Sequence, residues 1–350
     1  MIYDRLADLP LRIDAVDVAR LERDTSSGFT RATSVVSLSG HGAVGRGEDV
    51  TYETDEHSPD RWADLDLSLA GEYTLDSFST LLDGRDLFPA PPDREDFRHY
   101  RRWAFESAAL DLGLAQAGAT LGGRLGRSYD PVRFVSSARL STVDSDDPLT
   151  ADRVHRLLAV HPDLRFKLDP TPEWPAALFD ELAATGAVRI LDLKGQYRGT
   201  DVDTPPDPEL YEHVVEAFPE AIVEDPALTE ATRHVFDGRQ GRVAWDAPIE
   251  GVDSVEALPF EPAWLNVKPS RFGTVESLLA TIAHCERRGI ELYGGGQFEL
   301  GVGRRQIQAL ASLFYPRGPN DVAPVAYNDP DPGEDLPASP LAPPEPDAGL

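Results

Sequence analysis

Residues 188–225, VRILDLKGQYRGTDVDTPPDPELYEHVVEAFPEAIVED, decide the fold of this 350-residue chain. Two short apolar runs, VRILDLK and AIVED, enclose a segment, PELYEHVVEAF, whose apolar residues recur at helical spacing. A strand, a helix and a second strand in this order indicate two parallel strands joined by a helical crossover. The stretch therefore predicts one unit of a larger parallel α/β sheet.

The same alternation continues over residues 130–328. We expect further strands in VRFVSSARL, LRFKLD, RVAWD, AWLNVK, IELYGG and VAPVAY, and further helices in WPAALFDELAATG, VESLLATIAHCERRG and GRRQIQALASLF. About eight strands separated by helices favour a closed β/α barrel. The alternative is a doubly wound open sheet, but the chain has no GxGxxG after its first strand and no GxxxxGK[ST] anywhere.

The N-terminal part has a different pattern. LRIDAVDVARLER and TRATSVVSLSG are typical of strands, and GHGAVGRGE is expected to form a glycine turn before a strand in DVTYET. Residues 95–117 are predicted to form a helix that the glycines of GATLGGRLG end. The tail is acidic and proline-rich, and we expect it to be irregular or partly disordered. We divide the chain into residues 1–128, 129–328 and 329–350, and allow the tail to pack back on the first part.

The composition restricts the partners of the protein. Acidic residues outnumber basic ones 61 to 33, and the net charge of −28 repels nucleic acid and anionic membranes. We interpret this charge as a solvated surface suited to a salty cytoplasm. The single cysteine, Cys285, excludes an intrachain disulfide, and there is no apolar run of the roughly 18–20 residues that span a bilayer and no signal-peptide pattern. We therefore expect a cytoplasmic protein, and leave open whether it forms a homo-oligomer.

Three carboxylates follow consecutive predicted strands. Asp192 ends RILD, Glu224 lies in AIVED, and Asp246 ends RVAWD. The carboxyl ends of barrel strands meet at one face, so these side chains are expected to converge there. Converging carboxylates repel one another unless a cation binds them, and an all-oxygen ligand set favours Mg²⁺ or Mn²⁺ over zinc.

Lysine is used only three times, as Lys167, Lys194 and Lys268, and every other basic residue is arginine. All three lysines lie at predicted strand ends of the barrel. Arginine can replace a structural lysine, but it stays protonated, whereas a general base must lose its proton. The choice of residue therefore nominates these lysines for acid/base chemistry.

Taken together, these segments resemble the enolase superfamily, in its mandelate racemase and muconate lactonizing enzyme branch. WAFESAALDLGLAQAG resembles the capping-domain helix of that family, and RFK resembles its KxK strand end, with Arg165 in place of the first lysine. VEDP, AWDAP, NVKPSRFG and GGGQFELGVG resemble its metal, lysine and glycine-rich loop motifs. No histidine stands at a predicted strand end, so the chain is more similar to muconate lactonizing enzymes than to mandelate racemase.

The resemblance implies an α/β fold, a modified (β/α)7β TIM-type barrel with an N-terminal α+β capping domain. It also implies Mg²⁺, with Mn²⁺ as the alternative, and removal of the α-proton of a small carboxylate substrate through a metal-stabilised enolate. The implied metal ligands are Asp192, Glu224 and Asp246, and the implied acid/base pair is Lys167 and Lys268. We add Lys194, which departs from the family pattern, as a third catalytic residue. The implied substrate contacts are Arg165, Gln297, Glu299, Asp321, and Ser27 and Phe29 of a lid loop.

The outcome of the reaction stays open at this point. Two bases on opposite faces of a substrate permit inversion at carbon, and one base with one acid or electrostatic group permits elimination or cycloisomerisation. We favour racemisation, epimerisation or cycloisomerisation. Lys194 stands where the family usually has asparagine. The alternative reaction is dehydration of a sugar acid or related hydroxy acid, with Lys194 as an extra acid/base. The last strand holds only the first aspartate, Asp321, of the DxD found in dipeptide epimerases, which argues against dipeptides. A Schiff-base aldolase and a barrel that binds ligand without turnover are the remaining rivals.

Overall fold

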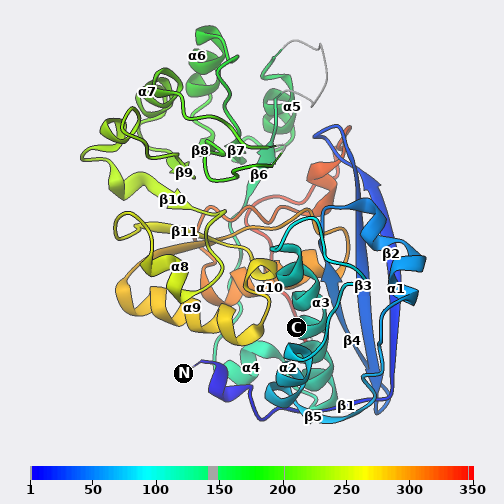
Figure 1. Ribbon diagram of the computed structural model, residues 1–350. Helices are drawn as coiled ribbons and strands as arrows, with labels where there is room; N and C mark the ends of the chain where they lie inside the picture. The colour runs from blue at the N-terminus through cyan, green and yellow to red at the C-terminus, as the bar shows by residue number, and fades with distance from the viewer. Residues whose placement is uncertain (1, 141–148, 201, 346) are drawn as a thin grey trace.

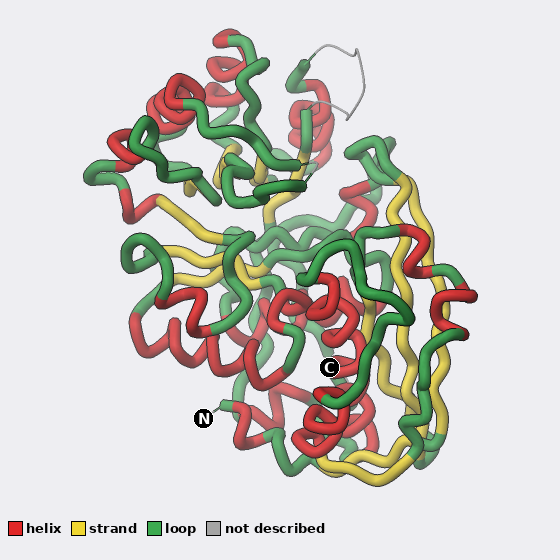
Figure 2. Tube along the Cα trace, in the orientation of Figure 1, coloured by secondary structure: helices red, strands yellow, loops and turns green. Residues whose placement is uncertain are grey.

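The structure is a computed structural model that describes residues 2–140, 149–200, 202–345 and 347–350. An antiparallel sheet with a long helix against it comes first, and a parallel sheet flanked by helices follows (Figures 1 and 2). Among the described residues, no helix is long and apolar enough to cross a bilayer.

The N-terminal part contains two antiparallel sheets, β2-β3-β4 and β1-β5. Its strands are β1 (Pro10–Ile13), β2 (Ala15–Asp24), β3 (Thr30–Gly40), β4 (Ala43–Asp49) and β5 (Gly71–Thr74). Its helices are α1 (Pro59–Ala63), α2 (Leu75–Asp83), α3 (Phe97–Gln116) and α4 (Leu121–Leu125). The expected helix over 95–117 is thus α3, which begins and ends within two residues of the prediction.

One prediction for this part is wrong. In the glycine-rich segment only His41 and Gly42 form the expected turn, and the residues after them form strand β4. The expected strand in DVTYET is absent beyond Asp49, the last residue of β4, and a 3-10 turn, Thr54–His57, begins at its last residue. The reason is the packing of α3 flat on β4. A Cβ added to Gly47 would lie 2.0 Å from the carbonyl oxygen of Ala104, and one added to Gly45 would lie 2.1 Å from the amide nitrogen of Leu112. Glycine is needed here so that a strand and a helix backbone can approach, rather than to bend the chain.

The second part is a seven-stranded, all-parallel sheet in the order β12-β11-β10-β9-β8-β7-β6. Its strands are β6 (Val135–Ala138), β7 (Arg165–Leu168), β8 (Val188–Asp192), β9 (Ile222–Glu224), β10 (Val243–Trp245), β11 (Trp264–Val267) and β12 (Glu291–Gly294). Its helices are α5 (Asp152–Val160), α6 (Ala176–Ala184), α7 (Pro208–Ala217), α8 (Val252–Glu256), α9 (Val275–Arg288) and α10 (Val302–Phe314). Each of these strands lies inside a segment predicted from the sequence.

An irregular segment joins the two edge strands of this sheet. The amide of Val135, in β6, donates to the carbonyl of Asn320 over 2.8 Å, and the amide of Asp321 donates to the carbonyl of Gly294, in β12, over 2.7 Å. The predicted eighth strand in VAPVAY is wrong, because that segment forms a 3-10 turn, Val325–Asn328, in place of a strand. The expected barrel with an N-terminal capping domain is confirmed.

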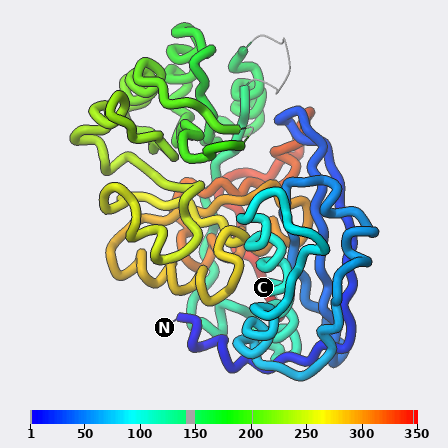
Figure 3. Tube along the Cα trace, in the orientation of Figure 1, coloured from blue at the N-terminus to red at the C-terminus, as the bar shows by residue number. Residues whose placement is uncertain are grey.

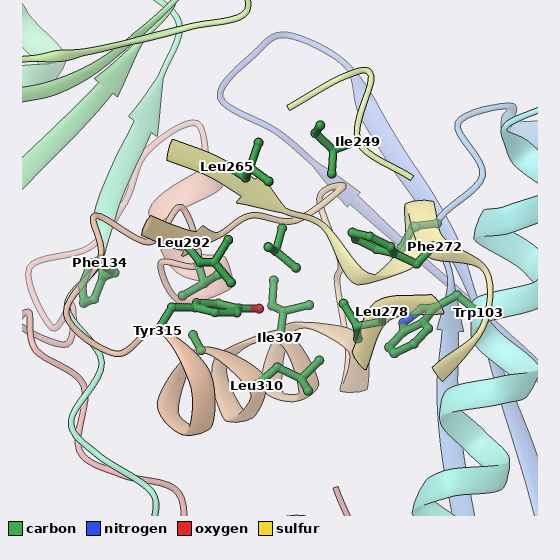
Figure 4. Packing of buried hydrophobic residues seen from close by; sticks show 14 of the residues in the cluster. Trp103, Phe134, Ile249, Leu265, Phe272, Leu278, Leu292, Ile307, Leu310 and Tyr315 are labelled. Atoms are coloured by element: carbon green, nitrogen blue, oxygen red, sulfur yellow. The ribbon is translucent and has the colours of Figure 1, made fainter. Parts of the chain in front are cut away.

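The hydrophobic core is continuous between the two parts. Figure 4 shows Leu292 of β12 with Ile307 and Leu310 of α10 on one side, and Trp103 of α3 near Leu278 of α9 on the other. These side chains are buried, and α3 contacts α9 as well as the turn after β11. The capping helix is therefore fixed on the barrel by apolar packing.

The described residues of the tail, 329–345 and 347–350, contain no helix and only isolated β-bridges. Leu341 pairs with Val132 at the entrance to β6, and the amide of Leu350 donates to Asp111 Oδ1 of α3 over 2.9 Å. The C-terminus accordingly lies against the capping helix (Figure 3).

Candidate active site

Three buried carboxylates meet at the carboxyl ends of neighbouring strands. Asp192 is the last residue of β8, Glu224 is the last residue of β9, and Asp246 follows β10. Each has an oxygen within 4.8 Å of an oxygen of the other two, and all three side chains are inaccessible to solvent. A buried set of this kind with oxygen donors alone fits a hard divalent cation such as Mg²⁺ or Mn²⁺.

The electrostatics of these carboxylates show how strongly they repel one another. Burial would raise the pKa of Asp192, but Lys167 and Lys194 hold it below its ordinary value. Burial would also raise the pKa of Asp246, but the charges of Arg271 and Lys268 hold it below its ordinary value. For Glu224, burial and the charges of Asp192 and Asp246 prevail over Lys167 and raise the pKa well above its ordinary value. The raised pKa of Glu224 thus reflects its burial and the repulsion from the other two carboxylates.

Two lysines approach the carboxylates from the flanking strands. Lys167 of β7 lies with Nζ 3.1 Å from Asp192 Oδ2, and it also donates to Glu224. Lys268 follows β11, and its Nζ lies 2.8 Å from Asp246 Oδ2. Burial lowers the pKa of Lys268, and the nearby charge of Arg271 lowers it as well. The charge of Asp246 has the opposite effect but does not outweigh them. The sheet order β7-β8-β9-β10-β11 therefore places one lysine on each side of the carboxylates.

Lys194 reaches the site in an unusual backbone conformation. Its φ of 55° is in the left-handed region, and its amide donates to Asp192 Oδ1 over 3.1 Å. Its Nζ donates to Asp192 Oδ2 and lies 3.7 Å from Asp169 Oδ2. The left-handed turn lets one residue hold Asp192 with both its backbone and its side chain.

Several site residues were not singled out by the sequence. Tyr197 donates to Asp246 Oδ2 over 2.8 Å, and Arg271 donates to Tyr197 over 3.1 Å and to Asp246. Asp225 accepts from the amides of Asp246 and Ala247, each over 2.8 Å, and burial with the charge of Asp246 raises its pKa to about 7. Tyr197 and Arg271 each lie three residues after a predicted lysine, at Lys194 and Lys268, which is the signal that was available.

A cavity of about 530 Å³ opens above the carboxylates. Both parts of the chain line it. From the predicted site the lining includes Lys167, Lys194, Lys268, Gln297, Asp321, Ser27 and Phe29. The rings of Phe29 and Phe298 meet edge to face at 5.4 Å, so the predicted lid loop contacts the loop after β12. The aromatic residues Tyr52, Phe97 and Tyr100 add a capping-domain wall.

Two predicted substrate contacts lie elsewhere. Arg165 begins β7, and its Nη1 donates to the carbonyls of Asp163 and Leu164, each over 3.0 Å, outside the cavity. Lys167, later in the same strand, and Asp169, just after it, line the cavity, whereas Arg165 does not. Asp169 Oδ1 is buried and has no hydrogen-bond partner within the described part of the chain.

Glu299 is the second predicted substrate contact that does not line the cavity. It is buried behind the cavity wall, where its Oε1 accepts from the amide of Gln297 over 2.8 Å and its Oε2 lies 3.4 Å from Arg304. It shapes the loop after β12 and does not reach the cavity, because the loop turns at Phe298, whose φ is 57°. Gln297, by contrast, lines the cavity and donates to Tyr100 of α3 over 3.1 Å.

Comparison with known sequence families gives two matches. The N-terminal domain of a family described as domain of unknown function DUF8230 matches residues 4–124, and its C-terminal domain matches residues 128–329. Among curated proteins, none is similar enough in sequence to count as a match.

Solved structures share the fold over most of their length. A muconate lactonizing enzyme from Pseudomonas putida has 19% identity and a TM-score of 0.62, over 89% of this chain and 88% of that one. A dipeptide epimerase from Methylococcus capsulatus, solved with a Mg ion, has 17% identity and a TM-score of 0.62, over 91% and 88%. A member of the enolase superfamily from Listeria innocua has 18% identity and a TM-score of 0.62, over 89% and 85%. The resemblance predicted from the sequence is confirmed at the level of the fold.

Proposed function

We propose that this chain, which belongs to the family described as domain of unknown function DUF8230, is a Mg²⁺-dependent enzyme. In this proposal the enzyme removes the α-proton of a carboxylate substrate and passes through an enolate. The fold and the buried acidic triad support a metal-dependent enzyme in general. Within that class we propose racemisation, epimerisation or cycloisomerisation as the reaction.

The observation that carries the proposal is the position of two buried lysines on either side of three buried carboxylates. Lys167 is the last but one residue of β7 and Lys268 follows β11, while the carboxylates lie at the carboxyl ends of the three strands between them. Both lysines line the cavity, so a substrate bound there has an amine on each side. Two acid/base groups on opposite faces are what inversion at a carbon atom requires.

The chemistry explains why these groups occur together. Loss of an α-proton next to a carboxylate places a second negative charge on the carboxylate oxygens, and a divalent cation held by Asp192, Glu224 and Asp246 would stabilise that charge. Lysine can both take up and return a proton, which arginine cannot do. Phe29 and Phe298 line the cavity with their rings in edge-to-face contact, and this contact would limit access of bulk water.

A second reaction is favoured by a specific observation. Lys194 lines the cavity with its Nζ between Asp192 and Asp169, where it can protonate a leaving hydroxide. Dehydration of a hydroxy acid is therefore the alternative that we propose.

Solvent exchange tests the proposal and separates the two reactions. The protein with Mg²⁺ is incubated in D₂O with N-acyl amino acids, sugar acids and muconate, and each recovered acid is analysed by mass spectrometry and chiral chromatography. An isomerase introduces deuterium at the α-carbon, a dehydratase releases water, and a chelator stops either reaction. Turnover of a carbonyl compound that persists with chelator and is trapped by borohydride would replace the proposal by a Schiff-base aldolase.

A further inference from the structure

We propose that Tyr293 is a positioning residue that leaves Glu224 only one oxygen for a cation, and that it thereby favours Mg²⁺ over Ca²⁺ at the buried triad. This inference rests on the proposed function, because it assumes that a divalent cation binds Asp192, Glu224 and Asp246. It assigns the choice of cation to a tyrosine in β12, three strands away from β9 in the sheet.

The first step is the place of Tyr293 in the barrel. Its side chain is fully buried, lies outside the cavity lining, and belongs to a small apolar cluster with Ile190, Ile222 and Ala244. Each of these three residues precedes a triad carboxylate by two positions on the same strand face, so the cluster lies one layer closer to the amino ends of the strands. Tyr293 therefore approaches the triad from the barrel interior, on the side away from the cavity.

The second step concerns the two oxygens of Glu224. The hydroxyl of Tyr293 donates to Oε2, and Nδ2 of Asn266 donates to the same oxygen over 3.3 Å. Asn266 and Tyr293 are register partners in β11 and β12, so their side chains share the inner face of the barrel. The other oxygen, Oε1, accepts from Lys167, which lines the cavity. Oε2 is thus held by donors of the barrel interior, and Oε1 lies on the side of the cavity.

The third step is that the other two carboxylates show a similar division. At Asp192 the backbone amide of Lys194 donates to Oδ1, and two lysine ammonium groups lie at Oδ2. At Asp246 the guanidinium of Arg271 donates to Oδ1, while the ammonium group after β11 and the hydroxyl of Tyr197 share Oδ2. Each carboxylate of the triad thus has one oxygen beside a lysine ammonium and a second oxygen held by another donor.

This division restricts how a cation is bound. A divalent cation takes the oxygens beside the ammonium groups, because there one positive charge replaces another. Oε2 of Glu224 stays with the Tyr293 hydroxyl, so Glu224 contributes Oε1 alone. Mg²⁺ is small, requires near-ideal octahedral geometry and suits carboxylates that bind through one oxygen. Ca²⁺ is larger, takes more oxygens and accepts both oxygens of one carboxylate. The Tyr293 hydroxyl therefore acts against Ca²⁺.

Calorimetry with two cations tests the proposal without a substrate. The metal-free protein is titrated with Mg²⁺ and with Ca²⁺, and the ratio of the two dissociation constants is compared between the wild type and Tyr293→Phe. The variant keeps the buried ring and frees Oε2 of Glu224. We expect its Mg²⁺ affinity to fall by about 10–100-fold, the usual effect of losing a hydrogen bond to a metal ligand. Its Ca²⁺ affinity should fall much less, so the preference for Mg²⁺ shrinks by about tenfold or more.

Tyr327→Phe is the matched control, because Tyr327 is also fully buried and its hydroxyl donates to the carbonyl of Pro337 over 2.8 Å, outside the triad. This variant should keep the wild-type ratio. The melting temperature of each metal-free protein is recorded as well, since a merely structural tyrosine lowers it without changing the ratio. If Tyr293→Phe does not fold, Asn266→Ala removes the second donor to Oε2 and should shift the ratio in the same direction.

Three results would overturn the proposal while leaving the metal site intact. They are a wild type that binds Ca²⁺ as tightly as Mg²⁺, an unchanged ratio in the folded variant, and an equal change of the ratio in Tyr327→Phe. A wild type that binds neither cation would overturn the proposed function together with this inference, so the two failures are told apart.

Discussion

At the scale of single residues, the site is built from a contrast between lysine and arginine. Arg271 and Lys268 both approach Asp246, but only lysine can exist as a neutral base at a working pH. The chain keeps lysine at three strand ends that line the cavity and uses arginine at every other basic position. This pattern is what a need for proton transfer would produce.

Substitution of Lys268 by arginine separates proton transfer from charge. Lys268→Arg keeps the positive charge beside Asp246 but removes the group that loses a proton, so we expect deuterium incorporation to fall by about 10²–10⁴-fold. Mg²⁺ affinity should stay within a few-fold of the wild type, measured by calorimetry. A variant that exchanges at the wild-type rate would remove Lys268 from the mechanism.

His57 provides a pH-dependent prediction in the capping domain. Its Nε2 donates to the carbonyl of Thr51 over 2.8 Å, and its Nδ1 lies 2.9 Å from the hydroxyl oxygen of Ser34, so both nitrogens of the buried ring have a partner. Burial lowers its pKa below the ordinary 6.5; the charges of Arg31 and Arg101 act in the same direction, and Asp49 opposes them.

A group whose pKa is lower in the folded state stabilises the fold above its ordinary pKa and loses that contribution as the pH falls. The wild type should therefore lose more unfolding free energy between pH 7 and pH 5 than His57→Gln does. Denaturant titrations at several pH values measure this difference. Parallel curves for the two proteins would show that His57 does not contribute.

At the scale of elements, the contact between β4 and α3 fixes the capping domain. Two glycines of β4 let the helix backbone approach the strand, as the short distances from a Cβ at Gly45 or Gly47 show. Sequence patterns recognise a strand by its side chains, and a strand whose inner face consists of glycines has none to recognise. This is why the segment was predicted to be a turn.

Gly47→Ala tests this contact. The added methyl group would meet the carbonyl oxygen of Ala104 at 2.0 Å, so helix or strand must shift, at a cost of about 1–3 kcal/mol. Thermal unfolding should show a clearly lower melting temperature. Gly241→Ala is the control, because nothing lies within 4 Å of its Cβ position, and it should leave stability almost unchanged. Equal melting temperatures for the two variants would contradict the account of this interface.

The parallel strands were predictable for a physical reason. A strand buried on both faces is a short apolar run, and such runs as RILD and RVAW are distinct in sequence. The sequence predicts that a strand exists more reliably than it predicts the residues that the strand end brings to the cavity. At β7 both Lys167 and Arg165 were expected at the site, and the structure brings Lys167 and Asp169 to the cavity but not Arg165. Contacts that depend on loops, such as Tyr197 with Asp246, were indicated in the sequence only by a position three residues after a predicted lysine.

At the scale of the whole molecule, the cavity lies between the two parts of the chain. The barrel supplies the carboxylates and lysines, while the capping domain supplies Phe29, Tyr52 and Tyr100. A chain with a net charge of −28 thus gathers its lysines at one internal site, where they offset buried carboxylates. Attraction of an anionic substrate by such a chain depends on this local charge and on a bound cation.

The measurement that tests the central claim most directly is a Mg²⁺ titration of the metal-free protein by calorimetry, compared with Glu224→Gln. Glu224 is buried at the centre of the triad, and its replacement removes one charged ligand with little change of shape. Glu230→Gln is the control, because Glu230 is exposed and its loss alters the total charge equally.

We predict one Mg²⁺ per chain in the wild type and in Glu230→Gln, with a stabilisation of about 2.7 kcal/mol when free Mg²⁺ is one hundred times Kd. Glu224→Gln should lose this binding and this stabilisation. Absence of binding in the wild type, or equal affinity in Glu224→Gln, would contradict the account.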